Sequence, residues 1–348
     1  MNKWMYLPLL VLSTACSSSF LGEQPADDAR ENFEYLWKEV QQKYSFLDYK
    51  GLNWDSVYTV YSGRIQPQMS QEALFELLAE LTNTLRDGHA NVFAPFDYSV
   101  YYPTFLNSPE NYDSRLLLER YFLRNPRQYS ITGPFQHTVL DTLGQRIGLV
   151  AYRSFGSSFT RAEIDYVLQQ FTDVDGVILD LRSNGGGSIQ LAHQLAGYFA
   201  ANRVTSYYSR IKSGPGRNEF TPEQPVEVIP SGSPYRYTGR LAVLVNRQSY
   251  SATSMFSLHV RALPQARLVG DSTGGGLGAP NGGELPNGWT YRFSVTQSLS
   301  AETDPSGARY NWEDGVPPHI RVNMQAADAQ QGFDSIVERA IRYIIDGN

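Results

Sequence analysis

An apolar segment that runs directly into three consecutive glycines is the feature that most constrains how this chain folds. Residues 176–181 read Gly-Val-Ile-Leu-Asp-Leu, which is typical of a buried strand, and residues 185–187 are all glycine. A helical pattern then extends over residues 188–201. Glycines leave backbone N–H groups unhindered, and the N-terminus of the following helix adds partial positive charge. The segment therefore predicts a strand–turn–helix unit whose turn can hold a negative group.

The residues around this turn do not fit the known phosphate-binding loops. A Walker loop places Lys and Ser or Thr after its last glycine, whereas Gly187 is followed by Ser-Ile-Gln. A dinucleotide-binding loop has spaced glycines, not contiguous ones. Two interpretations stay open: a tight turn without a ligand, or a site for the oxyanion of an acyl-transfer reaction, which would also need a nucleophile and a base.

Composition excludes several other classes of protein. The 348 residues suffice for one large or two ordinary domains, and the formal net charge of -6 argues against a nucleic-acid partner. The single cysteine, Cys16, excludes an internal disulfide and a metal–thiolate cluster. We expect no metal and no cofactor.

The first residues resemble a bacterial lipoprotein signal peptide. A basic start at Lys3 precedes an apolar run that is too short to span a bilayer, and small residues precede Cys16. Ser13 stands where the lipobox usually has Leu. The resemblance implies a signal peptide over residues 1–16, acyl chains on Cys16 and a polar tether over residues 17–26. The protein would then be lipid-anchored in the cell envelope, at the periplasmic face or the cell surface; an ordinary secretory signal is the alternative.

The rest of the chain divides into three segments by its hydrophobic pattern. Residues 27–95 are predicted to form a small N-terminal helical unit, with helices at 27–43, 54–62 and 71–86. Residues 96–142 have little periodicity and are interpreted as a connector or insert with one helix near 114–123. Residues 143–348 alternate strands and helices, which indicates an α/β core.

A second strand-to-helix junction supplies a candidate nucleophile. The apolar strand expected at 241–245 ends in a polar turn, and Ser251 lies where the next helix is expected to begin. A serine at this position can cap the helix or act as a nucleophile whose oxyanion is bound by adjacent N–H groups. Ser249 and Ser254 are also near, so this window alone does not single out one serine.

The base that a serine nucleophile needs is restricted by the distribution of lysine and histidine. No lysine follows Lys212, so none lies beyond the serine. His259 belongs to the same predicted helix as Ser251, two turns on, and could not reach its hydroxyl. His89 follows Gly88 in a loop after a helix, where a sharp turn could present the imidazole.

Five segments, in this order along the chain, resemble the motifs of the S41 family of serine proteases, which includes the C-terminal processing proteases and the tricorn-core proteases. They are residues 85–89, 180–187, 245–252, 269–276 and 313–318. The resemblance implies a crotonase/ClpP-like layered α/β core and selects Ser251 among its neighbours. Processing proteases have a catalytic Lys where this chain has Gly276, so the resemblance is to the histidine-dependent, tricorn-like branch. The interval between the first two motifs is too short for a PDZ domain.

The same resemblance implies a serine endopeptidase or peptidase that cleaves peptide or protein substrates through an acyl-enzyme at Ser251. His89 would be the base and Glu313 would support it. The implied oxyanion hole comprises backbone N–H groups of Gly185, Gly186 and Ala252. The alternative is a catalytically inactive S41-fold lipoprotein that binds a peptide or a hydrophobic ligand.

Several other motif residues are expected to be structural. Asp180, Arg182 and Asn184 would hold the glycine turn through hydrogen bonds and an ion pair. Asp87 would cap its own turn. The glycines at 274–276 would form a flexible lip beside the site.

Overall fold

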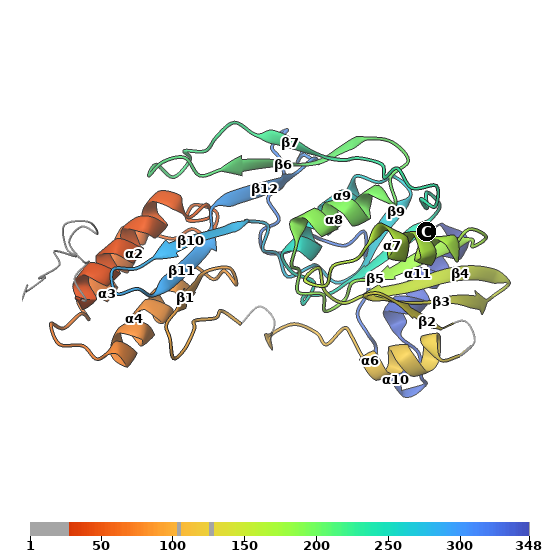
Figure 1. Ribbon diagram of the computed structural model, residues 1–348, viewed down its shortest axis with the longest axis horizontal. Helices are drawn as coiled ribbons and strands as arrows, with labels where there is room; N and C mark the ends of the chain where they lie inside the picture. The colour runs from red at the N-terminus through yellow and green to blue at the C-terminus, as the bar shows by residue number, and fades with distance from the viewer. Residues whose placement is uncertain (1–27, 103–105, 125–128, 348) are drawn as a thin grey trace, which may run out of the picture.

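The structure is a computed structural model that describes residues 28–102, 106–124 and 129–347. The predicted signal peptide over residues 1–16, with Cys16, and the tether over residues 17–26 lie outside the described residues. In the part of the chain that the structure describes, no helix is long and apolar enough to cross a membrane. A large and a small region lie side by side, and a third sheet extends along both (Figure 1).

The large region is built on a seven-stranded sheet in the order β13-β9-β8-β5-β4-β3-β2. The strands from β13 to β4 are parallel, and β3 and β2 continue the sheet in antiparallel fashion. In sheet order their bounds are β13 Ile320–Arg321, β9 Ala266–Gly270, β8 Leu241–Val245, β5 Gly176–Asp180, β4 Gln145–Tyr152, β3 Phe135–Thr142 and β2 Ser130–Thr132.

Helices cover both faces of this sheet, because its central strands are apolar on both sides. Leu179 of β5 packs into a cluster that includes residues of α7 (Arg161–Gln169), α8 (Ile189–Gly197) and α9 (Ala252–Arg261). Its neighbour Ile178 packs on the opposite face with α11 (Ser335–Asp346), α6 (Ser114–Leu117) and the short π-helix η1 (Leu118–Phe122). This layering confirms the predicted α/β core.

The segment interpreted as a connector contributes two strands to this sheet. Residues 130–142 form β2 and β3, and β3 pairs with β4 along its full length, from Phe135 opposite Tyr152 to Thr142 opposite Gln145. The lower boundary of the core at residue 143 was therefore wrong. Polar residues at buried as well as exposed positions of β3, such as His137 and Asp141, had hidden the strand pattern, and the hairpin turn that follows has Leu143 at φ +49°.

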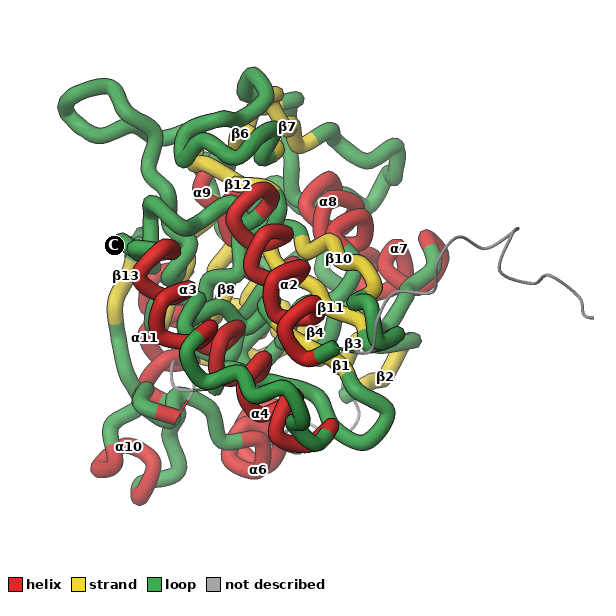
Figure 2. Tube along the Cα trace, turned by 90° about the vertical axis from the view of Figure 1, so that its left-hand side faces the viewer, coloured by secondary structure: helices red, strands yellow, loops and turns green. Residues whose placement is uncertain are grey.

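The small region contains the three predicted helices and a three-stranded sheet. The helices are α2 (Ala29–Lys43), α3 (Trp54–Ser62) and α4 (Gln71–Asn83), and the side chain of Ser70 caps α4. The sheet has the order β1-β11-β10, with bounds β1 Asn91–Phe93, β11 Thr290–Ser294 and β10 Pro280–Glu284. Figure 2 shows α2 in front of β10 and β11.

The small region is thus neither wholly helical nor contiguous in sequence. Its core joins Phe33, Leu78 and Val92 from the N-terminal segment with Tyr291 and Phe293 from the distant β11. The N-terminal unit predicted at 27–95 was therefore incomplete, since it needs the β10–β11 hairpin to bury its apolar side chains.

A third sheet and one short helix complete the described elements. The sheet has the order β12-β6-β7, with bounds β12 Thr296–Ser300, β6 Val204–Ile211 and β7 Gln224–Val228, and the helix is α10 (Ala326–Gln330). Because β12 follows β11 almost directly, this sheet links the two regions.

Candidate functional site

Ser251 lies at a sharp turn between a buried strand and a helix. The turn connects β8 to α9, and Ser251 precedes the first helical residue, Ala252. Its backbone has φ +58°, which is strained for a residue with a side chain and costs about 1–3 kcal/mol. Its side chain makes no capping hydrogen bond. The capping interpretation is therefore wrong: the turn exposes the hydroxyl to another partner.

That partner is His89. The Nε2 atom of His89 is 3.0 Å from the Oγ atom of Ser251, although 162 positions separate the two residues in sequence. His89 lies in the loop between α4 and β1 of the small region, and its side chain is buried. The site therefore joins a serine of the large region to a histidine of the small one. Ser249 is fully buried and its hydroxyl donates to the carbonyl of Leu181, so it is part of the scaffold.

Asp87 fixes the loop that carries His89. Its Oδ1 atom accepts the backbone N–H of His89 at 2.8 Å, as expected for a residue that caps its own turn. Its Oδ2 atom accepts the hydroxyl of Ser294, which lies at the end of β11. The carboxylate therefore ties the histidine loop to the β10–β11 hairpin.

The surroundings of His89 favour a neutral imidazole. Burial lowers its pKa from the ordinary value of 6.5, the negative charge of Asp87 raises it, and the positive charge of Arg292 lowers it again. The backbone carbonyl of Gly278 also raises the pKa. The Nδ1 atom of His89 is buried and makes no hydrogen bond of ordinary geometry with the described residues, so the effect of Gly278 comes from a weaker contact. The net direction is downward, so the ring can accept a proton at neutral pH.

Asn184 holds the glycine turn beside Ser251. Its Oδ1 atom accepts the N–H of Gly186 at 3.0 Å and the hydroxyl of Thr253 on α9 at 2.9 Å. Its Nδ2 atom donates to the carbonyl of Tyr152 at 2.9 Å. The predicted structural role of Asn184 fits these contacts, which join the turn to the first turn of α9.

Gly186 is where the two strand-to-helix turns come closest. It has φ +94°, and a Cβ atom at this position would lie 2.6 Å from the carbonyl oxygen of Tyr250 and 2.9 Å from the amide nitrogen of Ala252. Only glycine allows this approach. Gly185 differs, because a Cβ atom there would meet none of the described residues within 4 Å.

The hydrogen bonds around this turn change the predicted set of oxyanion donors. The N–H of Gly186 is already donated to Asn184, so Gly186 was wrongly included. The N–H groups of Gly185 and Ala252 have no backbone or side-chain acceptor in the described part of the chain. Ala252 is also the first residue of α9, where the helix dipole is positive.

An ion-pair network with no solvent exposure supports the turn from behind. Arg182 donates from Nε and Nη2 to the two carboxylate oxygens of Asp180, and from Nη1 to Asp334 at the start of α11. Burial raises the pKa of Asp180, but the charges of Arg153 and Arg182 outweigh it and hold that pKa well below the usual range. Removing one partner of such a buried pair costs about 3–5 kcal/mol. Asp180 and Arg182 therefore act as structural residues, as predicted.

Glu313, which was predicted to support His89 directly or through a neighbouring group, makes its side-chain hydrogen bond to a backbone amide instead. Its Oε2 atom accepts the N–H of Leu277 at 2.7 Å, and its side chain is buried. Burial and the charge of Asp87 raise the pKa of Glu313 well above its usual range, while Lys50 lowers it. Asp87, not Glu313, is therefore the carboxylate whose charge acts on the imidazole of His89.

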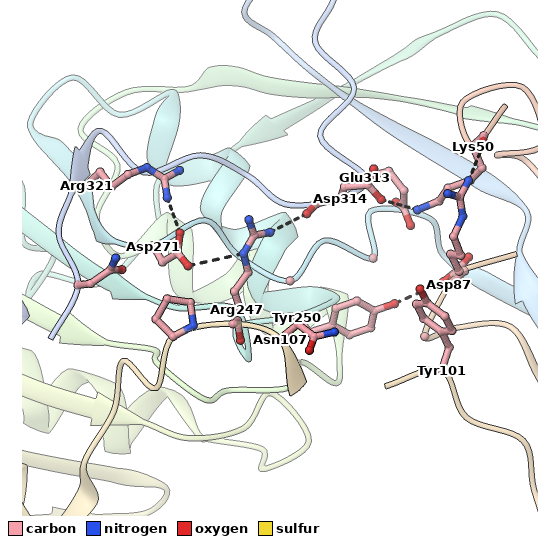
Figure 3. Close-up of a pocket in the computed structure, with 17 residues that line it drawn as sticks. Lys50, Asp87, Tyr101, Asn107, Arg247, Tyr250, Asp271, Glu313, Asp314 and Arg321 are labelled. Atoms are coloured by element: carbon pink, nitrogen blue, oxygen red, sulfur yellow. Dashed lines mark hydrogen bonds and ion pairs between the residues drawn. The ribbon is translucent and has the colours of Figure 1, made fainter. Parts of the chain in front are cut away.

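Two cavities meet at Tyr250. One encloses about 580 Å³ and is lined by Ser251, His89, Gly185, Met255 and Arg292, among others. The other, of about 590 Å³, is lined by Glu313 and by several charged side chains that pair with one another, such as Arg247 with Asp271 (Figure 3). Tyr250 lines both cavities, and its hydroxyl is 3.4 Å from Oδ1 of Asp87. The first cavity is therefore the one open to the serine–histidine pair.

The glycines at 274–276 form a buried, hydrogen-bonded support and not the flexible lip that was expected. The carbonyl of Gly275 accepts the N–H of Ser251 at 2.9 Å, and the N–H of Gly276 donates to the carbonyl of Glu313 at 3.1 Å. Sequence reasoning thus missed this support, Tyr250 and the electrostatic effect of Asp87. Asp87 could have been found from its position two residues before His89.

Comparison with known proteins identifies a family. Residues 146–322 match peptidase family S41, and residues 25–83 match the tricorn protease C1 domain. A crystal structure from Parabacteroides merdae, named "putative peptidase", is 35% identical over 93% of this chain and 98% of that one, with a TM-score of 0.84.

More distant structures share the fold. Mature CPAF is 13% identical over 92% of this chain and 98% of that chain, with a TM-score of 0.66. The photosystem II D1 C-terminal processing protease is 16% identical over 85% and 93% of the two chains, with a TM-score of 0.53. The fold and the matched segments define a peptidase of the mixed α/β type. The chain belongs to peptidase family S41.

Proposed function

We propose that this protein is a serine peptidase that cleaves peptide bonds through an acyl-enzyme at Ser251, with His89 as the base. The observation that carries the proposal is the 3.0 Å contact between Nε2 of His89 and Oγ of Ser251, at a strained turn that exposes the serine to a cavity. A catalytic base has to lie within hydrogen-bond reach of the group whose proton it takes, directly or through one water.

The proposed reaction begins when the Oγ atom of Ser251 attacks a peptide carbonyl carbon. The hydroxyl proton moves to Nε2 of His89, which is free to accept it when Nδ1 carries the ring proton. The tetrahedral intermediate collapses, the C–N bond breaks, and His89 returns the proton to the leaving amine. Water then attacks the ester in the same manner, His89 again takes and returns the proton, and Ser251 is restored.

The developing oxyanion would be bound by the N–H groups of Gly185 and Ala252. Both lie at the turns that bring Ser251 into the cavity, and both lack an acceptor among the described residues. Loss of one such donor typically costs about 10²–10³ in rate. Asp87 would stabilise the imidazolium that forms, since its charge raises the pKa of His89.

Labelling with a fluorophosphonate probe tests the proposal. We expect the purified protein to react at a single serine, identified as Ser251 by mass spectrometry of the labelled peptide. Ser251→Ala should abolish labelling. Ser183→Ala is the matched control, because Ser183 lines the same cavity and has a similar backbone conformation of φ +58°; it should still be labelled.

Hydrolysis of a peptide library measured with the same variants completes the test. Cleavage by the unaltered protein but not by Ser251→Ala would support the assignment. An intact fold that neither reacts with the probe nor cleaves any peptide would instead favour a binding protein of the same fold.

The segment that precedes the described residues carries a second proposal, which concerns location. The basic start at Lys3, the short apolar run and Cys16 support a lipid anchor in the cell envelope. Metabolic labelling with a palmitate analogue should mark the expressed full chain, and Cys16→Ser should remove the label. The anchor would be contradicted if neither the unaltered chain nor Cys16→Ser takes up the label and the two migrate alike on a gel.

A further inference from the structure

Arg292 extends from the small region into the cavity that contains Ser251. It lies in β11, where Tyr291 and Phe293 point into the small core and are buried. Side chains alternate along a strand, so Arg292 lies on the opposite face of the sheet, where it is exposed and lines the cavity. Its charge also acts on His89. The guanidinium is therefore close to the reacting groups.

The guanidinium of Arg292 is oriented by two residues of β1. Asn91 is the direct cross-strand partner of Arg292, and its Oδ1 atom accepts the Nε–H at 2.7 Å. The buried Asn91 is itself fixed, because its Nδ2 atom donates to the carbonyl of Ser99 at 2.8 Å. The ring of Phe93 lies 5.5 Å from the guanidinium carbon. This support reduces the conformational entropy that a long side chain loses on binding.

The two Nη atoms of Arg292 have no partner in the described part of the chain. The bond to Asn91 uses Nε alone, and the described residues offer no carboxylate within ion-pair distance and no acceptor for either Nη atom. The described lining of the cavity contains no aspartate or glutamate. By contrast, Arg247 and Arg321 in the neighbouring cavity both pair with Asp271.

We propose that Arg292 is a specificity-determining residue that binds a carboxylate of the peptide substrate. The carboxylate is either the C-terminal group of a short peptide or the side chain of an acidic residue near the scissile bond. A guanidinium with free Nη atoms presents parallel N–H donors that match a carboxylate. The inference rests on the proposed peptidase function and adds the charge that its substrates carry.

Two series of fluorogenic peptides distinguish the sources of the carboxylate. The first compares a free C-terminal acid with the corresponding C-terminal amide at several distances from the cleaved bond. The second compares Asp and Glu with Asn and Gln at each position that flanks the bond. We expect one acidic member to be cleaved about tenfold to a hundredfold more efficiently than its neutral partner, as measured by kcat/KM.

The ratio of acidic to neutral kcat/KM is then measured in three variants. Arg292→Gln should reduce the ratio to about one, Arg292→Glu should invert it, and Arg292→Lys should retain part of it because a single ammonium replaces the fork. Arg115→Gln is the matched control, since it removes one exposed positive charge on α6, outside the cavity. It should leave the ratio as in the unaltered protein.

The possible results separate failure of this inference from failure of the proposed function. Efficient cleavage with no preference for any acidic member, or a preference that Arg292→Gln retains, would overturn the role of Arg292 alone. An equal decrease in kcat/KM for the acidic and the neutral peptide in Arg292→Gln would also overturn the role of Arg292. If the unaltered protein neither cleaves peptides nor reacts with a fluorophosphonate, both proposals fail together.

Discussion

The large and small regions are held together by different means, and each supplies one half of the candidate site. The large region buries a mostly parallel sheet between two layers of helices, and Ser251 and the glycine turn both follow strands of that sheet. The small region packs helices on a short antiparallel sheet, and His89 lies in one of its loops. The large region therefore positions the nucleophile through a rigid sheet edge. The small one positions the base through a loop that Asp87 ties down.

This difference shows that the site depends on how the two regions meet. A hydrogen bond across such a boundary is sensitive to small displacements, and an error of about 1 Å can cost about 10²-fold in rate. The four predictions below test the contribution of each region, from the largest expected effect to the smallest.

The first prediction treats Ser251 and His89 as a single unit. Ser251→Ala and His89→Ala should each lower kcat/KM by about 10⁴-fold or more, because neither residue activates the reaction alone. The double variant should be no slower than the worse of the two, as measured with one fluorogenic peptide. If the losses in transition-state free energy added up in the double variant, the two residues would contribute independently, which would contradict the proposed pair.

The second prediction concerns the close approach within the large region. Gly186→Ala should lower kcat by about 10²–10³-fold, since the added Cβ would meet the backbone of Tyr250 and Ala252 at less than 3 Å. Gly185→Ala is the matched comparison, because a Cβ there meets nothing within 4 Å. Gly185→Ala keeps the backbone N–H of residue 185, so the decrease in kcat should be much smaller than in Gly186→Ala. Equal losses in the two variants would contradict the steric argument.

The third prediction compares the two hydrophobic cores. Leu78 in α4 and Leu244 in β8 are both fully buried, so each change to Ala should lower the free energy of unfolding by about 2–5 kcal/mol. In Leu78→Ala the activity should be lost on heating before most of the circular dichroism changes, because the loop of His89 depends on the small core. In Leu244→Ala both signals should change together. Coincident transitions in both variants would indicate one cooperative unit.

The fourth prediction concerns pH and has the smallest effect, a change of no more than about tenfold at neutral pH. His89 acts as a base only when neutral, and burial lowers its pKa, so activity should persist below its ordinary pKa of 6.5. Asp87→Asn removes a charge that raises this pKa, so the acid limb of the kcat/KM profile should move to lower pH. Arg292→Gln removes a charge that lowers it, so the limb should move to higher pH.

Glu313→Gln provides the control for these profiles. Glu313 is not among the groups that shift the pKa of His89, so this variant should move the acid limb less than either of the other two. A shift as large as that of Asp87→Asn would restore Glu313 to the role first predicted for it.

Much of the large region could be predicted from sequence, because its information is local. The run from Gly176 to Leu179 is apolar and β5 is buried at every position, and the three glycines that follow favour a turn over a longer strand. The family motifs then selected Ser251 and His89, whose contact at 3.0 Å spans 162 positions in sequence. Spacing alone could not have shown that contact.

The errors came from interactions that no local pattern reports. Gly186 was misassigned because the side chain of Asn184 occupies its N–H. Glu313 was expected to support His89, whereas its side chain accepts a hydrogen bond from a backbone amide of a distant loop, that of Leu277. The hairpin of β10 and β11 was read as part of the large core, since its pattern shows a strand but not the sheet that it joins.

The hairpin of β10 and β11 also determines when the small region can fold. Residues 29–92 cannot bury their apolar side chains until Tyr291 and Phe293 have been synthesised, and these lie about two hundred residues later in the chain. Contacts of such long range form late, because the loop that they close is costly in entropy. During synthesis on a ribosome, His89 therefore stays without its support until nearly the whole chain has emerged. A peptidase built in this way cannot cleave its own unfolded segments during folding, because its site is not yet complete.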